Sequence, residues 1–579
     1  MSMANDARRR GDRMPRMPRS RVLLIAAAAL AAEGSLLAQK TPKVAELPPL
    51  AENVTVAITN VEVVVTNSKG NRVPGLKKED FQVFEDGIPQ PITNFYAVTG
   101  GRTILADGSE ISLSSPPAPA AAAEIPAALK AKYVVYVDNL NIHPLHRTRV
   151  FRSVYDFLDK AIGPNAEGMV MTFNRSLKVR QKFTSEKGLL VGALEKVAGE
   201  AGGGQTIVSE REDALQKIND MKNQGEAINY AEQVARSMDD DLRASLDGLK
   251  TAIDGLAGVD GRKILIYVSD GLPQTVGQEL FDTIQTKFHA SQASTEAFTF
   301  DRTASYLALV REANAQGVTL YAIDASGLQA DENVSAERAT MDSRPSTFFL
   351  RQNYQQPLQT LARETGGIAA INTNDPTREL DEVARDFSDF YSLGYRSTRG
   401  AVDRPHQIEV KLTKPGLRAR YRSGYMEKTV ETRTAEEVTA ALTYPRSENP
   451  LKFTIAVGDP KAYSAENYLV PIRMSIPLEN VTLVPDGAQY RGRLYVYFVV
   501  LDSDGKQSDL QIRPLEIKVP LKNYDSARTK TYGYDVQLIM IPGAQRLSVA
   551  IRDGVSNAVS FAQKGVFISV LPAEKKAGS

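Results

Sequence analysis

Short apolar runs alternate with helical stripes between residues 132 and 397, and this alternation constrains the fold more than any other feature of the chain. The run from Tyr133 to Asp138 precedes a stripe from Val150 to Ile162, and a stripe from Leu242 to Leu256 precedes the run from Ile264 to Asp270. Short runs rich in Val, Ile and Tyr are typical of strands buried on both faces. Their repeated alternation with helices predicts a doubly wound, mostly parallel sheet with right-handed crossovers.

Both flanks of this α/β region carry β-strand patterns. Upstream, Val54 to Val65 alternates apolar and polar residues, and Asp86-Gly87 predicts a tight hairpin turn. Downstream, strand candidates from Phe453 to Val570 are separated by glycine-containing turns, which indicates an antiparallel sandwich. The predicted organisation is a signal peptide at 1–39, a small N-terminal β domain at 50–103, a Ser/Pro/Ala-rich linker at 104–131, an α/β domain at 132–397, a closing β segment at 398–429, a linker at 430–449 and a C-terminal β-sandwich at 450–573.

The N-terminal residues predict export. Seven arginines from Arg8 to Arg21 precede an apolar run from Val22 to Ala32 and small residues up to Gln39, which is a secretory signal pattern. The apolar run is too short to span a bilayer core of ~30 Å, and no later stretch reaches about 18 uninterrupted apolar residues. We therefore expect no transmembrane segment in the mature chain and a periplasmic, cell-surface or extracellular location, with an uncleaved N-terminal anchor as the lesser alternative.

Charge and composition exclude several classes of function. Seventy basic and sixty-nine acidic residues give a net charge of +1, so no overall field attracts nucleic acid. The chain has no cysteine, which excludes disulfides, thiol nucleophiles and cysteine-ligated zinc. Dinucleotide, phosphate-loop and serine-hydrolase motifs are also missing. We expect a protein that is not an enzyme.

Acidic residues end three of the predicted strands. Asp138 and Asp270 end two of them, Asp324 ends a third, and the glycines before Thr206 lie between the first two in the sequence. Because ligands bind at the carboxyl ends of strands in open parallel sheets, these residues predict an oxygen-rich face. Two aspartates close together repel, so without a cation one of them should have a raised pKa. The alternative interpretation is that each aspartate caps a following turn or helix.

Several motifs together resemble the von Willebrand factor type A (vWA)-related family of exported bacterial proteins, of the type found in acidobacteria. They are Gly75-Leu-Lys-Lys-Glu-Asp-Phe81-Gln-Val-Phe84-Glu-Asp-Gly87, Tyr136-Val-Asp138-Asn139-Leu140-Asn141, Val268-Ser-Asp270-Gly271, Ser392-Leu-Gly-Tyr395 and Arg420-Tyr-Arg-Ser-Gly-Tyr425. The resemblance implies a vWA-like α/β domain. It also implies a metal-ion-dependent adhesion site that holds Mg²⁺.

By position, Asp138, Thr206 and Asp270 are similar to the first aspartate, the threonine and the second aspartate of that adhesion site. Leu140 and Ile142 stand where the family has two serines, and neither side chain offers the oxygen ligand that Mg²⁺ requires. The predicted site is therefore degenerate. Further candidates for the same face are Asn139, Asn141 and Asp324.

Two other polar clusters have simpler interpretations. His143 and His146 follow the Asp138 loop, and Pro144 between them disfavours a helix that would align them, so we expect a solvated loop. The run Asp239-Asp240-Asp241 is expected to cap a helix that begins near Leu242.

The leading hypothesis is an exported, non-enzymatic binding or adhesion-type protein that docks a protein or other macromolecular partner through the degenerate site. Long segments from Leu272 to Arg302 and from Ser326 to Gln355 follow strand ends and would contribute to the docking face. One alternative is a structural or assembly component of the bacterial envelope with no metal. Another is a metal-dependent hydrolase. The sequence does not predict the oligomeric state.

Overall fold

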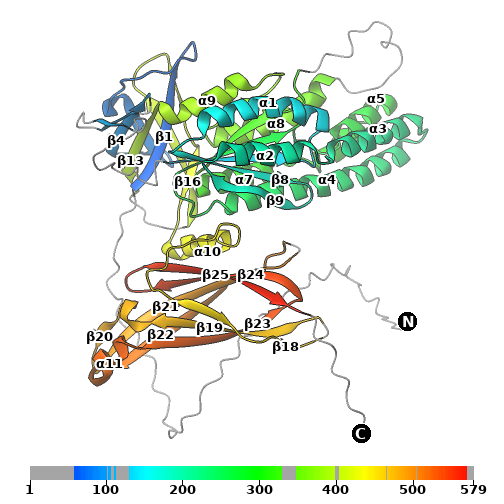
Figure 1. The fold of residues 1–579 in the computed structure, drawn as a ribbon. Coiled ribbons are helices and arrows are strands. Elements are labelled where there is room, and N and C mark those ends of the chain that lie inside the picture. Colours follow the sequence, from blue (N-terminus) through cyan, green and yellow to red (C-terminus); the bar gives the residue numbers. More distant parts are fainter. Residues whose placement is uncertain are drawn as a thin grey trace, which may run out of the picture. The chain divides into compact units, whose positions relative to one another are not determined.

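The computed structural model describes residues 58–100, 102–105, 110–112, 130–328, 347–397, 403–464, 466–503 and 505–569 (Figure 1). The predicted signal peptide lies outside these residues, as does most of the predicted linker at 104–131. Among the described residues, those up to Ala440 form one compact unit and those from Ala441 form a second. Within the described residues, no helix has the length and hydropathy needed to cross a bilayer.

The central sheet of the first unit has the strand order β12-β11-β10-β7-β8-β9. All neighbouring strands are parallel except β8 and β9, which are too close in sequence for a crossover and form an antiparallel pair. A mixed α/β fold with a mostly parallel sheet is thereby confirmed. The strands are β7 (Ala131–Asp138), β8 (Ala166–Phe173), β9 (Leu177–Thr184), β10 (Arg262–Ser269), β11 (Val318–Asp324) and β12 (Ala369–Ala370).

Helices cover both faces of this sheet (Figure 1). On one face, Val135 and Val137 of β7 pack with Phe151 and Val154 of α1 in a core whose members are almost fully buried. The helices are α1 (Pro144–Ala161), α2 (Lys187–Ala198), α3 (Gly204–Asp220), α4 (Gln224–Asp254), α5 (Gln278–Phe288), α6 (Ser291–Phe298), α7 (Thr303–Gln316), α8 (Thr347–Glu364) and α9 (Thr377–Ser388). The segment from Leu272 to Arg302, expected to be a long loop, contains α5 and α6.

Asp239 lies inside helix α4, so the prediction that Asp239 to Asp241 cap a new helix is wrong. The helix begins much earlier, where the Asn223 side chain accepts a hydrogen bond from the backbone N–H of Glu226. Asp239 is buried and accepts two hydrogen bonds from the Arg302 guanidinium, at 2.5 and 2.9 Å. The aspartate therefore joins α4 to the start of α7.

Two antiparallel sheets, in the orders β15-β1-β13-β4-β5-β6 and β16-β14-β2-β3, form what we call the β module. The predicted N-terminal β domain and closing β segment both contribute to it, and so does β13, which the residue pattern placed at the end of the α/β domain. Its strands are β1 (Ile58–Asn67), β2 (Phe81–Glu85), β3 (Ile88–Gln90), β4 (Ile92–Thr99), β5 (Arg102–Leu105), β6 (Glu110–Ser112), β13 (Phe390–Arg396), β14 (Arg404–Leu412), β15 (Leu417–Arg420) and β16 (Gly424–Glu427). Helix α10 (Val430–Ala440) follows.

The second unit consists of two antiparallel sheets around one core. Val470 and Ile472 of β19 and Val496 and Phe498 of β21 belong to this core, each at most 1% exposed. Strands β17, β18, β19 and β23 form one sheet, and β20, β21, β22, β24 and β25 form the other. The elements are β17 (Thr454–Val457), β18 (Lys461–Ala462), β19 (Tyr468–Pro477), β20 (Val484–Asp486), β21 (Gln489–Leu501), β22 (Gln511–Pro520), α11 (Tyr524–Arg528), β23 (Thr531–Met540), β24 (Gly543–Asp553) and β25 (Val559–Ile568).

Candidate functional site

Asp138, the last residue of β7, is buried and its carboxylate is occupied by protein donors. One oxygen accepts hydrogen bonds from the Tyr267 hydroxyl at 2.6 Å and the Asn141 side-chain amide at 3.0 Å. The other accepts from the backbone N–H groups of Leu140 and Asn141, both at 3.2 Å. Burial raises the pKa of Asp138, although these donors act in the opposite direction. The raised pKa therefore has a different cause from the repulsion by Asp270 that the sequence suggested.

Asp270 follows β10 and accepts hydrogen bonds from the start of α1. The backbone N–H of His143 and the Nδ1 of His146 both lie near one carboxylate oxygen, at 2.8 and 2.9 Å. The other oxygen is buried and has no hydrogen-bond partner, while the side chain as a whole is 21% exposed. The backbone N–H of Asp270 donates to the carbonyl of Asn141, so the two acidic loops are joined directly.

The two histidines belong to a helix start, and the expectation of a solvated loop is wrong. His143 is the N-cap of α1 and Pro144 is its first residue, a position where proline is favourable because its missing N–H has no helical partner. His146 lies within the first turn and is 32% exposed at its side chain. Pro144 thus begins the helix whose first turn places the His146 ring within hydrogen-bond distance of Asp270.

Thr206 lies apart from the Asp138 carboxylate. It is exposed in the first turn of α3, and the described contacts do not join it to either aspartate. The preceding glycines pack against the Asp138 loop: a Cβ atom at Gly204 would lie 2.5 Å from the carbonyl carbon of Ile142, and one at Gly203 would lie 2.9 Å from the carbonyl oxygen of Leu140. Close backbone packing explains why glycine is needed there.

These residues do not fit an Mg²⁺ site. Leu140 and Ile142 are 3% and 0% exposed, so buried apolar side chains stand at the two positions where the resemblance to vWA domains would require serine oxygens. Asp138 would have to give up four protein hydrogen bonds to coordinate a cation, and Thr206 is not placed to assist. A hard cation needs near-octahedral oxygen coordination, which this set of residues does not supply.

The remaining candidates organise the edge of the sheet. The side-chain oxygen of Asn139 accepts a hydrogen bond from the buried Arg147 at 2.7 Å, and the Asn141 amide donates to Asp138 and to Ser245. Asp324 accepts hydrogen bonds from Ser326 and, at 2.7 Å, from the side-chain amide of Gln355. Asp324 therefore both forms a turn and fixes a residue of α8.

A hollow of ≈ 360 Å³ opens beside Gln355, and we call it the glutamine hollow. Its lining residues are Leu328, Phe348, Arg351, Gln352, Gln355, Gln356, Gln359, Ile371 and Asn372. Leu328 and Phe348 are 63% and 59% exposed, and the neighbouring Phe349 is 59% exposed. The sequence interpretation missed this feature, although two consecutive phenylalanines in a polar segment were a visible signal. Residues 329–346 lie outside the described part of the chain.

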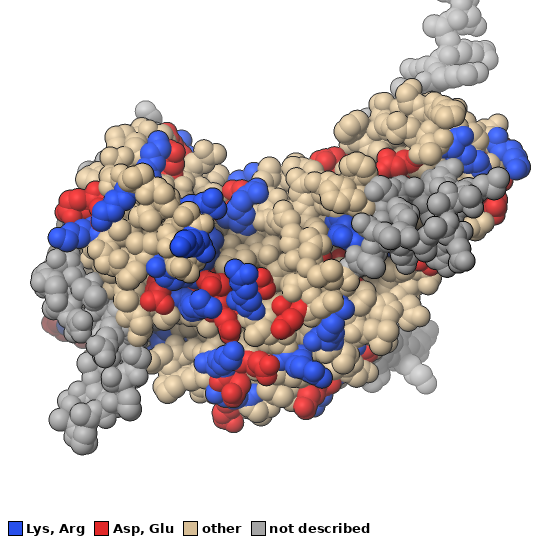
Figure 2. Space-filling view, turned by 90° about the horizontal axis from the view of Figure 1, so that it is seen from above, with Lys and Arg blue, Asp and Glu red and all other residues tan. Residues whose placement is uncertain are grey.

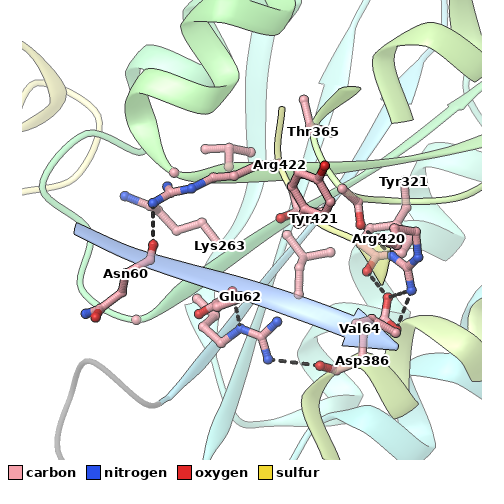
Figure 3. Close-up of a pocket in the computed structure, with 17 residues that line it drawn as sticks. Asn60, Glu62, Val64, Lys263, Tyr321, Thr365, Asp386, Arg420, Tyr421 and Arg422 are labelled. Atoms are coloured by element: carbon pink, nitrogen blue, oxygen red, sulfur yellow. Dashed lines mark hydrogen bonds and ion pairs between the residues drawn. The ribbon is translucent and has the colours of Figure 1, made fainter. Parts of the chain in front are cut away.

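A second pocket, of ≈ 240 Å³, lies between the β module and the amino ends of β10 and β11 (Figure 3). Arg262 pairs with Glu62 at 2.8 Å, and Arg422 donates to the carbonyl of Asn60 at 2.6 Å. Burial lowers the pKa of Lys263 to about 8. Charged side chains from segments distant in the sequence lie close together in this pocket, and most of them form ion pairs or hydrogen bonds that join the β module to the central sheet.

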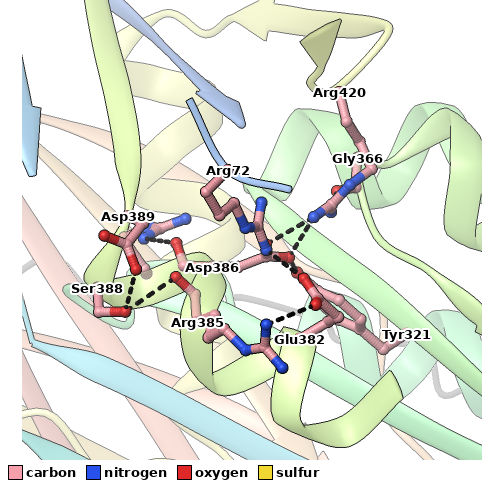
Figure 4. A network of polar contacts seen from close by, with 10 residues as sticks. Arg72, Tyr321, Gly366, Glu382, Arg385, Asp386, Ser388, Asp389 and Arg420 are labelled. Carbon is pink, nitrogen blue, oxygen red and sulfur yellow. Dashed lines mark hydrogen bonds and ion pairs between the residues drawn. The ribbon is translucent and has the colours of Figure 1, made fainter. Parts of the chain in front are cut away.

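Asp386 of α9 is the centre of the polar network beside this pocket (Figure 4). It is 1% exposed and accepts hydrogen bonds from Arg420 at 2.6 and 2.7 Å, and also from Arg72 and the Tyr321 hydroxyl. Burial alone would raise the pKa of Asp386, but the charges of Arg420 and Arg72 outweigh it and hold the pKa below its usual value. This network links β11, α9, β15 and the turn after β1.

No protein-family model and no curated protein sequence matches the chain. Similar solved structures include an aerotolerance-related membrane protein from Bacteroides fragilis, with 11% identity, a TM-score of 0.21 and coverage of 44% of this chain and 98% of that chain. The conserved hypothetical protein BatB from Bacteroides thetaiotaomicron has 12% identity, a TM-score of 0.21 and coverage of 45% and 97%. Proximal thread matrix protein 1 from the mussel byssus has 15% identity, a TM-score of 0.24 and coverage of 47% and 48%. These TM-scores are too low to carry an argument about family or function.

Proposed function

We propose that this chain is an exported, non-enzymatic binding protein with a vWA-like domain, and that the glutamine hollow docks a protein partner without a metal ion. The observation that carries the proposal is the set of exposed apolar side chains, Leu328, Phe348 and Phe349, beside a polar hollow at the carboxyl edge of the sheet. Solvent-exposed aromatic residues next to fixed polar groups are typical of protein-recognition surfaces.

The hollow favours an extended peptide segment of the partner. Four glutamines line it, and the exposed amides of Gln352 and Gln356 can both donate and accept hydrogen bonds, as a peptide backbone does. Gln355 is fixed by Asp324 and by Asn372, at 2.7 and 3.0 Å, so part of this surface is ordered before binding. Phe348 would contact an apolar side chain of the bound segment.

Charge contributes less to the proposed recognition. On the face seen in Figure 2, acidic and basic side chains are interspersed and no broad patch has one sign. The chain as a whole carries +1. Partner recognition would therefore depend on contacts at short range more than on long-range electrostatic steering.

Replacing Phe348 or Phe349 by serine should weaken peptide binding roughly tenfold each. The bound peptide would bury each phenyl group, and losing that burial costs about 1.5 kcal/mol or more of binding free energy. The probe is a set of peptides selected from a random phage-displayed library on the full mature chain, with affinities measured by fluorescence polarisation. Phe298→Ser is the matched control, since Phe298 is 76% exposed on α6 and should not affect binding.

The same peptides distinguish the alternative functions. Binding that survives a metal chelator and falls in the Phe348→Ser and Phe349→Ser variants supports the proposal. Binding that needs Mg²⁺, or that is equally weak in Phe298→Ser, contradicts it. A library selection that enriches no peptide favours an envelope component without a docking role at this edge.

A further inference from the structure

Glu85, Asp86 and His406 form a compact cluster in the β module, and none of them lines either pocket described above. The His406 Nδ1 lies 2.8 Å from an Asp86 carboxylate oxygen and 3.5 Å from a Glu85 oxygen. One potential ligand atom from each residue lies within 4.8 Å of the others, a property found in no other group of His, Asp and Glu among the described residues. Glu85 ends β2, Asp86 begins the hairpin turn, and His406 lies on the neighbouring strand β14.

The cluster is sealed toward the core and opens toward solvent. The side chains of His406 and Glu85 are 1% and 2% exposed, whereas that of Asp86 is 30% exposed. Nearby Glu427 has a raised pKa, first because of burial and then because of the Glu85 charge. In the described part of the chain no lysine or arginine forms an ion pair with Glu85. Glu85 accepts hydrogen bonds from the hydroxyls of Ser397 and Tyr425, at 3.1 and 3.0 Å, but these neutral donors leave its charge in place, and a cation in the cluster would compensate that charge.

Unpartnered polar atoms face the same region. The Tyr395 hydroxyl is completely buried and forms no hydrogen bond within normal geometry. The Tyr395 ring packs edge-on against Tyr425, with ring centroids 6.2 Å apart, and the Tyr425 hydroxyl donates to Glu85 at 3.0 Å. A buried oxygen of Glu427 also lacks a partner. Buried polar groups are nearly always paired, so these two oxygens favour a further polar component in this region.

We infer that Glu85, Asp86 and the Nδ1 of His406 bind a divalent transition-metal ion. Ligand bonds of about 2.0–2.2 Å place neighbouring ligand atoms roughly 3.0–3.5 Å apart, close to the 2.8 and 3.5 Å that separate the His406 Nδ1 from the two carboxylate oxygens. An imidazole combined with carboxylates suits Zn²⁺ or Mn²⁺ better than Mg²⁺ or Ca²⁺. On binding, Nδ1 releases any proton it carries, and the ion compensates the buried carboxylate charge. The ion would tie the β2–β3 turn to β14.

Asp86→Asn is the sharpest test variant because it keeps the turn. Asp86 has φ +49, a left-handed conformation that asparagine tolerates well. The full mature chain, stripped of metal by a chelator, is dialysed against Zn²⁺ or Mn²⁺ and then analysed by calorimetry and elemental analysis. We expect one ion per chain, a higher unfolding temperature with metal, and at least tenfold weaker binding in Asp86→Asn and His406→Gln.

Two control variants make the result specific. Glu409→Gln changes an exposed carboxylate on β14, and His146→Gln changes the histidine at the carboxyl edge; both should bind metal as the unmodified chain does. The inference is overturned if the chain takes up neither ion, if Asp86→Asn retains full affinity, or if His146→Gln abolishes binding. In those cases His406 is a buried partner of two carboxylates and no more.

Discussion

Replacing Asp386 by alanine is expected to lower the free energy of unfolding of the first unit by about 3–5 kcal/mol. The substitution leaves Arg420 and Arg72 without their shared carboxylate, in a region where their side chains are only 24% and 15% exposed. The Tyr321 hydroxyl loses its acceptor as well. Removing one partner of a buried ion pair is far more costly than removing a surface charge, because the remaining charge stays desolvated.

Asp381→Ala is the matched control, since Asp381 lies on the same helix but forms an exposed pair with Lys160 at 2.9 Å. A surface pair of this kind contributes roughly 0–1 kcal/mol. Urea unfolding followed by circular dichroism measures the difference, and hydrogen exchange of α9 and β15 locates it. Equal effects of the two substitutions would contradict a stabilising role for the Asp386 network.

The contribution of Asp386 should depend on pH with a definite sign. Its pKa is lower in the folded chain than the ordinary value of 3.8, so the unfolded chain binds the proton more readily. The stabilisation is therefore present above that ordinary value and is lost as pH falls through the lower folded-state pKa. The difference between the unmodified chain and Asp386→Ala should shrink in strong acid.

Asp138→Ala should destabilise the first unit by about 3 kcal/mol or more. Two backbone N–H groups, the Tyr267 hydroxyl and the Asn141 amide would each lose an acceptor, and an unsatisfied buried donor costs about 1–3 kcal/mol. Asp270→Ala should cost less, because Asp270 accepts from only His143 and His146 and is partly exposed. Urea unfolding of both variants provides the comparison.

Mg²⁺ gives this second prediction an independent check. A cation held by Asp138 in the folded chain would raise stability as its concentration rises. We expect millimolar Mg²⁺ to leave the unfolding free energy unchanged, because the protein already satisfies the carboxylate. A stabilisation by Mg²⁺ that disappears in Asp138→Ala would show that the aspartate is a metal ligand after all.

The parts of the fold that were predictable from sequence are those with a local signal. The apolar runs that became β7 and β10 place Asp138 and Asp270 at one edge of the sheet, as expected. The pairing of Val61 with Leu393 in the β module has no local signal, because it joins segments at opposite ends of the first unit. The strand patterns were visible there, but the partners were not.

In the candidate site too, features with a local sequence signal were predictable and contacts between distant segments were not. The sequence alone predicted that Leu140 and Ile142 offer no side-chain oxygen to this loop, and both are buried. The hydrogen bond from the Tyr267 hydroxyl to Asp138 depends on the register between β7 and β10, and a single sequence does not predict that register. The exposure of Phe348 likewise depends on where α8 begins, and the helix starts at Thr347, inside the long segment from Ser326 to Gln355 that the sequence analysis assigned to the docking face.

In the proposed function, the carboxyl edge of the central sheet docks its partner without a metal ion. A crystal structure of the full chain soaked in Mn²⁺, with an anomalous difference map, tests this most directly. Mn²⁺ shares the oxygen preference of Mg²⁺ and also accepts imidazole. We expect a peak at Glu85, Asp86 and His406 and none beside Asp138 or Asp270. A peak between Asp138 and Asp270, with the Tyr267 hydroxyl displaced, would contradict metal-free docking at this edge.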